Sequence, residues 1–205
     1  MKKGQQFKPI IQDIQERLIY SEPSLGLLEL NSIAKGLKVC DEVLKQASVD
    51  LIEAAPICTG KYLIIIGGEV DSVKSSFDRG LELAGVNIVD SLYLPKIDRK
   101  VFPALLGIQK VEEIESLGII ETVSVASSII AADIAVKTAE VDLIEIRLAQ
   151  GLGGKGFVLV SGNLNNVLAS IEAGIIPIRE KGLLLKEEII PSPDSLLINK
   201  IFLGR

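Results

Sequence analysis

A long internal repeat constrains this chain more than any other feature of its sequence. The thirty residues that begin at Ser24 recur, without a gap, from Ser116, and fourteen of the paired positions are identical. Most of the other pairs exchange one aliphatic residue for another. Similarity at a fixed offset of 92 residues indicates two copies of one structural unit. The identical positions of the first copy are Ser24, Leu25, Gly26, Glu29, Ser32, Ala34, Asp41, Lys45, Ala47, Val49, Asp50, Leu51, Ile52 and Glu53.

The repeat predicts two domains of the same design, at residues 23–103 and 116–205. Residues 104–115 would join them, and residues 1–22 would form an N-terminal extension. Hydrophobic periodicity and turn residues predict the same succession of elements in each copy. In first-copy numbers this is strand 25–30, helix 33–47, strand 50–55, a turn, strand 61–66 and helix 72–84.

The first helix of each copy carries an apolar stripe at helical spacing. Ser32 is a suitable N-cap for the first-copy helix. We expect the stripe to be buried in its own domain, with Cys40 as a small core residue. The stripe consists of Ile33, Leu37, Cys40, Leu44 and Ala47 in the first copy, and of Val125, Ile129, Ala132, Val136 and Ala139 in the second.

Composition excludes several classes of function. There is no histidine, which removes the commonest general base and the usual zinc and haem ligand. The net charge of −5 argues against a nucleic-acid partner. No apolar run is long enough to span a membrane and no signal peptide is evident, so we expect a cytoplasmic protein with no membrane partner. A mean hydropathy of +0.40 favours an oligomer that covers apolar surface.

The second cysteine, Cys58, lies in the turn "PICTGK", where no apolar periodicity accounts for it. In the cytoplasm such a residue is a thiol or a metal ligand rather than half of a disulfide. Gly60 permits backbone conformations in this turn that are closed to most residues. The second copy has "GLGGKG" at the corresponding place, which lacks the spacing of a phosphate-binding loop. Glu29 and Glu121 recur within strands without a companion base, which favours a structural hydrogen bond over catalysis.

The segments "LGLLE", "LKQASVDLIE" and "YLIIIGGEVDSVKSSFDRG" resemble the shell-protein domain of bacterial microcompartments. The second copy resembles it equally, so the likeness covers about residues 24–197. The resemblance implies an α/β (α+β) fold in which each domain is a small antiparallel sheet with flanking helices. It further implies a homotrimer that forms a flat pseudohexamer with a central pore and tiles into the shell with other shell proteins.

The turn "ICTGK" resembles an "ICPGK"-like turn in tandem-domain shell proteins of propanediol-utilisation compartments, with Thr59 in the proline position. "GLGGK" and "VDSLYL" also look like their counterparts there. This resemblance implies that Cys58 of three chains holds one [4Fe-4S] cluster at the pore. The backbone N–H groups of Thr59 and Gly60 would hydrogen-bond to the cluster sulfurs. Gly151, Gly153 and Gly154 would let the second-repeat loop pack closely around the pore.

Lys45 and Lys137 match lysines that lie along the edge of the disc in this family, where they meet neighbouring discs. A solvated lysine that favours the helix dipole is the alternative. The segments "PKID" and "PSPD" take the place of a proline-arginine motif that helps tiling, and Ser192 departs most from it.

Three functions remain open. The first is a structural shell protein, not an enzyme, whose cluster passes electrons across the shell to a redox protein inside or outside it. The second is a metabolite pore with an unligated Cys58. The third is a redox enzyme that uses Cys58 as nucleophile or thiol switch, although no second cysteine or histidine supports it. Residues 10–19 predict an amphipathic helix that either docks on its own domain or binds a partner.

Overall fold

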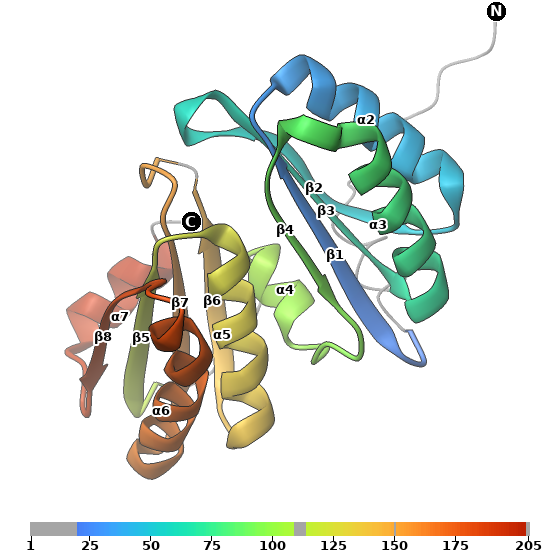
Figure 1. Cartoon of the computed structure of the whole chain (residues 1–205). Helices are drawn as coiled ribbons and strands as arrows, with labels where there is room; N and C mark the ends of the chain where they lie inside the picture. Colours follow the sequence, from blue (N-terminus) through green and yellow to red (C-terminus); the bar gives the residue numbers. More distant parts are fainter. Residues whose placement is uncertain (1–19, 109–113, 150, 204–205) are drawn as a thin grey trace, which may run out of the picture.

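The computed structural model describes residues 20–108, 114–149 and 151–203, which form two α/β units of the same topology (Figure 1). Each unit has a four-stranded antiparallel sheet, in the order β2-β3-β1-β4 in the first and β6-β7-β5-β8 in the second. The first sheet consists of β1 (Pro23–Leu30), β2 (Asp50–Ile57), β3 (Lys61–Glu69) and β4 (Ile88–Leu94). The second consists of β5 (Ser116–Thr122), β6 (Asp142–Leu148), β7 (Gly156–Gly162) and β8 (Leu184–Ile190).

Two helices cover one face of each sheet, and two shorter helices follow the last strands. The covering helices are α2 (Ile33–Gln46) and α3 (Val70–Ala84) in the first unit, and α5 (Val125–Thr138) and α6 (Leu164–Glu180) in the second. The shorter helices are α4 (Val101–Leu105) and α7 (Ser195–Leu203). The predicted α/β architecture of antiparallel sheets with flanking helices is therefore confirmed.

Local sequence explains where the first helix of each unit begins. The Ser32 side chain accepts a hydrogen bond from the backbone N–H of Lys35, as an N-cap residue does. Ser124 does the same for Ser127 and completes a capping box. The two copies even share a β-bulge, because the pairing register shifts at Ile52 in β2 and at Ile144 in β6.

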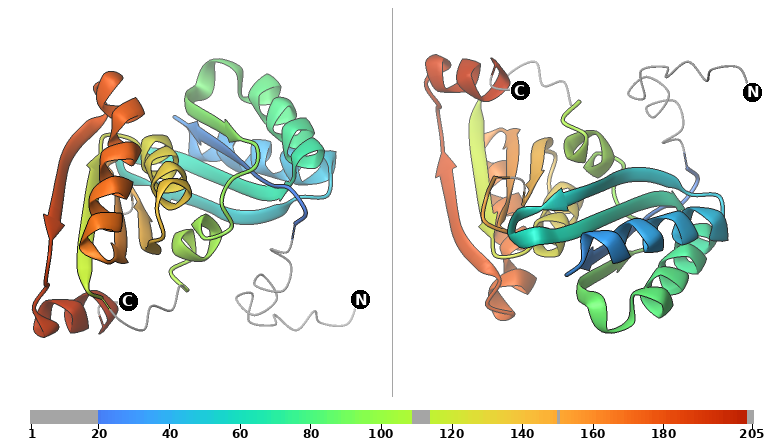
Figure 2. Two further views of the ribbon diagram at one scale, coloured as in Figure 1. Left: turned by 90° about the horizontal axis from the view of Figure 1, so that it is seen from below. Right: turned by 90° about the horizontal axis from the view of Figure 1, so that it is seen from above.

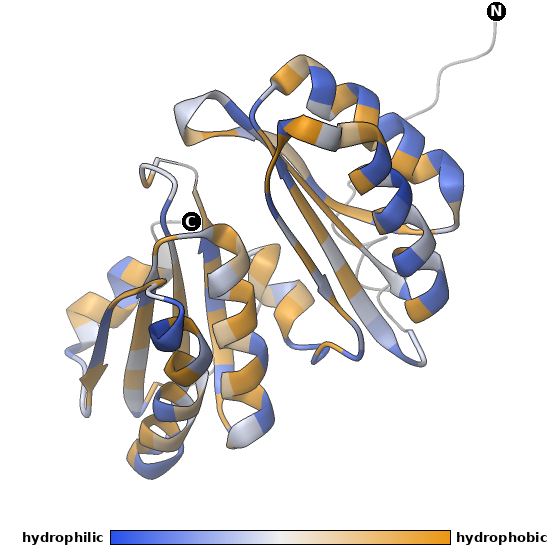
Figure 3. Ribbon diagram, in the orientation of Figure 1, coloured by the Kyte–Doolittle hydropathy of each residue, from blue (hydrophilic) through white to orange (hydrophobic). Residues whose placement is uncertain are grey.

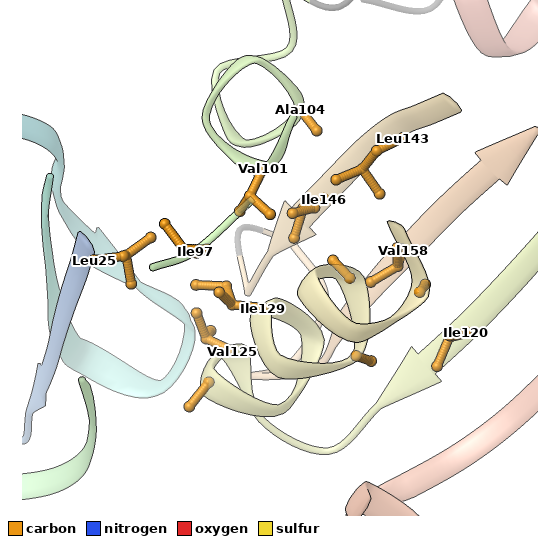
Figure 4. Close-up of a cluster of buried hydrophobic side chains, with 14 of the residues drawn as sticks. Leu25, Ile97, Val101, Ala104, Ile120, Val125, Ile129, Leu143, Ile146 and Val158 are labelled. Atoms are coloured by element: carbon orange, nitrogen blue, oxygen red, sulfur yellow. The ribbon is translucent and has the colours of Figure 1, made fainter. Parts of the chain in front are cut away.

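The segment that includes α4 connects the two units through packing as well as through the chain. Figure 2 shows α4 between the two sheets, and Figure 4 shows Val101 and Ala104 directed towards Leu143 and Ile146 of β6. Val101 and Ala104 are fully buried. One hydrophobic cluster therefore runs from the first unit into the second. The start of the predicted joining segment is thus a packed helix.

The apolar stripe predicted to be buried in both copies is buried in only one. Ile129 of α5 is 0% exposed, whereas its counterpart Leu37 in α2 is 56% exposed. The prediction for α2 is wrong because this helix packs on its own sheet through a neighbouring face. That face consists of Gly36, Val39, Cys40 and Val43. In α5 the stripe lies against the segment around α4, which comes from the other unit.

Hydropathy follows this difference (Figure 3). The strands of both sheets and helix α5 are predominantly apolar, while the outer surfaces of α2 and α3 carry many hydrophilic residues. No helix in the described part of the chain is long and apolar enough to cross a membrane. The amphipathic helix predicted at residues 10–19 lies outside the described residues.

Candidate functional site

Cys58 lies at the tip of the hairpin that joins β2 to β3. Ile57 pairs with Lys61, so the connecting turn contains only Cys58, Thr59 and Gly60. The cysteine is partly exposed. A thiol at the tip of a three-residue turn projects beyond the sheet, where groups from outside its own hairpin can reach it.

The turn has two consecutive residues with left-handed backbone, Thr59 with φ 68° and Gly60 with φ 75°. Glycine adopts this conformation readily, as the sequence predicted for Gly60, but a β-branched residue does so only under strain. The Thr59 hydroxyl donates a 2.6 Å hydrogen bond to the Cys58 carbonyl oxygen. Proline is restricted to φ near −65°, so this backbone excludes proline at position 59. The turn is therefore not shaped like one that contains the sequence ICPGK.

The glycine-rich loop of the second unit approaches Cys58 within the same chain. Gly151, Gly153 and Gly154 all have positive φ. The Cys58 N–H donates to the Ala149 carbonyl oxygen at 3.5 Å. Backbone N–H groups of the loop, first that of Gly153, hydrogen-bond to the Cys58 side chain and lower the pKa of the thiol. The loop thus favours the thiolate, which is the form that ligates metals.

The two cysteines have opposite environments. Cys40 is only 6% exposed, within the core between α2 and the first sheet. Burial, and then the charge of Asp41, raises the pKa of its thiol. The prediction that Cys40 is a core residue is confirmed, and Cys58 is the more reactive of the two thiols.

The two recurring glutamates form ion pairs at the base of the two loops. Lys61, which follows the Cys58 turn, donates to Glu29 at 2.6 Å, and Lys155 donates to Glu121 at 3.2 Å. The Glu29 side chain is 5% exposed and the Glu121 side chain 41%. The predicted structural role of both glutamates is confirmed, since each holds the start of the following strand to the first strand of its unit.

The structure places the two candidate edge lysines differently. Lys45 is largely exposed and bonds to Asp41 one turn earlier in α2. Lys137 bonds to the equivalent Asp133 at 2.7 Å, and it also donates to the Lys96 carbonyl oxygen at 2.8 Å. Lys137 therefore helps to join the two units of one chain. Contact with neighbouring discs stays a prediction for both lysines.

A single chain does not supply a complete metal site. Within residues 20–108, 114–149 and 151–203, no group of three or more His, Cys, Asp or Glu side chains could hold a metal ion. Thr59 and Gly60 follow Cys58 in the same turn, and their hydrogen bonds to a cluster stay a prediction. The chain offers one favourable thiolate, so a multi-thiolate site needs further copies of the chain.

Sequence reasoning missed two parts of this region. It did not anticipate that the loop around Leu152 would contact Cys58 within one chain, because backbone donors leave no pattern in side-chain types. It also missed the packing of α4. The spacing of Ile97, Val101 and Phe102 could have indicated a short amphipathic helix there.

Comparison with known proteins agrees with this architecture. The BMC domain model matches residues 24–97 and again 116–193. The chain is 42% identical to the bacterial microcompartment shell protein PduT of Citrobacter freundii over 170 residues, which cover 83% of this chain and 92% of PduT. It is 27% identical to the carboxysome assembly protein CcmO of Synechococcus elongatus, over 85% of this chain and 68% of that protein.

A crystal structure of a microcompartment protein from Desulfitobacterium hafniense superposes with a TM-score of 0.84 at 44% identity. The match covers 86% of this chain and 98% of that one. These matches confirm the predicted resemblance to tandem-domain shell proteins and the expected place in a microcompartment shell. The chain belongs to the BMC-domain family of bacterial microcompartment shell proteins and carries two copies of the domain in tandem.

Proposed function

We propose that this shell protein assembles as a homotrimer in which Cys58 of three chains ligates one shared [4Fe-4S] cluster at the central pore. The observation that carries the proposal is the position of Cys58, a partly exposed thiol at a hairpin tip with a lowered pKa. One chain offers one such thiolate, and a threefold axis would bring three together. The similarity to PduT supports the same arrangement.

The chain's own residues would hold and orient the cluster. Cys58 supplies the ligand atom, and the backbone donors of Gly153, Gly151 and Leu152 keep its sulfur in the thiolate form. The N–H groups of Thr59 and Gly60 are suited to hydrogen-bond to cluster sulfurs. When bound, a [4Fe-4S] cluster supplies one-electron transfer. The protein would thus pass electrons across the shell to a redox protein, without turning over a substrate.

Metabolite passage through a pore without a cluster is the alternative. The observation in its favour is the left-handed backbone of Thr59, which excludes the proline of the similar ICPGK turn. A different turn would aim the sulfur differently. The two functions make opposite predictions about iron content.

The test is anaerobic purification of the full chain, followed by visible absorbance, EPR and quantification of iron and sulfide. We expect a broad band near 400 nm and about four irons per three chains, as for a thiolate-ligated cluster. Cys58→Ala should remove both signals. Cys40→Ala is the matched control and should retain them, because that thiol lies in the core. Colourless wild-type protein after anaerobic reconstitution would overturn the cluster and leave the pore.

A further inference from the structure

The first unit exposes a surface whose equivalent in the second unit is covered. Val125 and Leu143 are both 0% exposed, whereas their counterparts Ile33 and Leu51 are 40% and 36% exposed. Leu37 adds to the same exposed surface. We call the surface formed by Ile33, Leu37 and Leu51 the α2–β2 face. It is apolar and contiguous with α2, so its exposure in an isolated chain calls for an occupant.

The occupant of the equivalent face in the second unit is residues 95–105 of the same chain. The Asp98 N–H donates to Asp133 Oδ1 at 2.7 Å, and Lys137 donates to the Lys96 carbonyl oxygen at 2.8 Å. Lys100 donates to the Val141 carbonyl oxygen at 2.8 Å. Val101 packs beside these bonds in the shared cluster (Figure 4). Polar and apolar contacts together form a complete seam between the two units.

The groups that receive this segment recur in the first unit. Asp41 and Lys45 are the counterparts of Asp133 and Lys137. The two form an ion pair with each other, and their side chains are 60% and 65% exposed. The α2–β2 face therefore combines the apolar surface, the carboxylate and the ammonium group that the second unit uses to bind residues 95–105.

The donor segment also recurs, at residues 191–201. The sequence "PKID" at residues 95–98 corresponds to "PSPD" at 191–194, and each is followed by a short helix. Asp98 Oδ1 accepts from the Lys100 N–H at 2.8 Å, and Asp194 Oδ1 accepts from the Leu196 N–H at 2.7 Å. Both segments therefore begin their helix with the same turn.

Helix α7 already has the pose that such docking requires. Ile201 packs against a cluster on the second sheet that contains Leu117, Ile144 and Leu159. Phe102 of α4 similarly lies directly over Gly67 of the first sheet. Leu197, the counterpart of the fully buried Val101, is 42% exposed. Helix α7 thus stays on its own sheet and leaves an apolar side open.

From this double recurrence we infer that residues 191–201 of one chain dock on the α2–β2 face of the next chain, and so reproduce between chains the seam that joins the two units within one chain. Asp41 of the neighbouring chain would accept from the Asp194 N–H, and its Lys45 would donate to the Ser192 carbonyl oxygen. The contact uses different surfaces on the two chains and is therefore heterologous, so a fixed rotation closes it into a ring.

This inference rests on the proposed trimer and assigns the residues of its interface. It also gives Lys45 a role at the seam between chains, where its partner is a backbone carbonyl oxygen. Because residues 191–201 are needed only between chains, their removal should separate the chains without unfolding either unit.

Site-directed disulfide cross-linking tests the seam. In the full chain with Cys40→Ala and Cys58→Ser, the pair Asp41→Cys and Asp194→Cys is oxidised with copper phenanthroline and examined by non-reducing electrophoresis. We expect covalent dimers and trimers as the main products, and no larger species. Each single cysteine variant should give no trimer. The matched control pair, Asp98→Cys with Asp133→Cys, should cross-link within one chain.

Sedimentation of the same proteins separates the possible failures. A wild-type trimer whose 41/194 pair does not cross-link, while the 98/133 pair does, would overturn the inference and leave the proposed trimer intact. A wild-type monomer would overturn both. Removal of residues 195–205 should convert the trimer to a folded monomer. If removal of residues 1–19 is required before the 41/194 pair cross-links, the N-terminal segment occupies the face and the inference is wrong.

Discussion

Helices α2 and α5 occupy the same place in the two copies of the domain, but only α5 has its apolar stripe covered. Ile129 in α5 is fully buried by the segment around α4, while Leu37 at the equivalent place in α2 is 56% exposed. The sequences of the two stripes are similar. The comparison teaches that an apolar stripe in a tandem repeat can belong to a contact between units, and one half of that contact is open in a single chain.

The largest effect should come from placing a charge on the two stripes. Ile129→Asp buries an unpaired carboxylate and is expected to cost about 4 kcal/mol or more of the free energy of unfolding. Leu37→Asp should leave the fold intact, because its side chain reaches solvent, but should prevent association of the chains. Circular dichroism in urea and sedimentation measure the two effects. Equal destabilisation by both variants would contradict the comparison.

The ion pairs at the base of the two loops provide a second contrast. Lys61→Met leaves the Glu29 carboxylate buried without its cation and should cost about 3 kcal/mol. Lys155→Met removes a partner from the more exposed Glu121 and should cost less than about 1 kcal/mol. Urea unfolding gives both values. Addition of Glu29→Gln to Lys61→Met should recover part of the loss, and no recovery would mean that the lysine stabilises by packing alone.

The crossings of the paired helices differ in how much room they leave. A Cβ atom at Gly174 in α6 would lie 2.9 Å from the Ala131 carbonyl oxygen, a backbone atom that cannot move aside. A Cβ atom at Gly80 in α3 would meet the Leu28 side chain, which can rotate. Gly174→Ala should therefore cost about 2 kcal/mol and Gly80→Ala about 1 kcal/mol. Thermal unfolding that ranks the two variants in the opposite order would refute this account.

The smallest effect concerns the two loops at the candidate site. The second loop places glycine at its left-handed positions, whereas the first has Thr59 at φ 68°. Thr59→Gly should relieve this strain and stabilise the protein by about 1 kcal/mol, less the added freedom of glycine in the unfolded chain. Gly60→Ala is the control and should destabilise. A lower melting temperature for Thr59→Gly would show that the hydroxyl contact to the Cys58 carbonyl oxygen outweighs the strain.

Much of the fold was accessible from the sequence because the repeat doubles every signal. The predicted strands and covering helices are present, and they differ from the observed ones by only a few residues at their ends. Cys40 and the glutamates were also interpreted correctly from their positions in the pattern. The burial of the α2 stripe was not, since periodicity identifies an apolar face without identifying what covers it.

The candidate site was only partly accessible. The sequence singled out Cys58 and the glycines of the second loop as unusual. It could not place the two loops against each other, because the contact is made by the backbone groups of Ala149 and Gly153. It also could not show that Thr59 adopts a backbone conformation closed to proline, since φ depends on the closure of the whole hairpin.

The sequence by itself determined the duplicated α/β topology and the core position of Cys40, because helical periodicity and strand alternation act over a few residues. Only the tertiary structure decided which copy of an equivalent surface is covered, because coverage depends on segments distant in the chain. Residues 95–105 reach the second unit, and nothing within the described part of the chain reaches the α2–β2 face in the same way. Similar local patterns therefore acquire different roles through long-range packing.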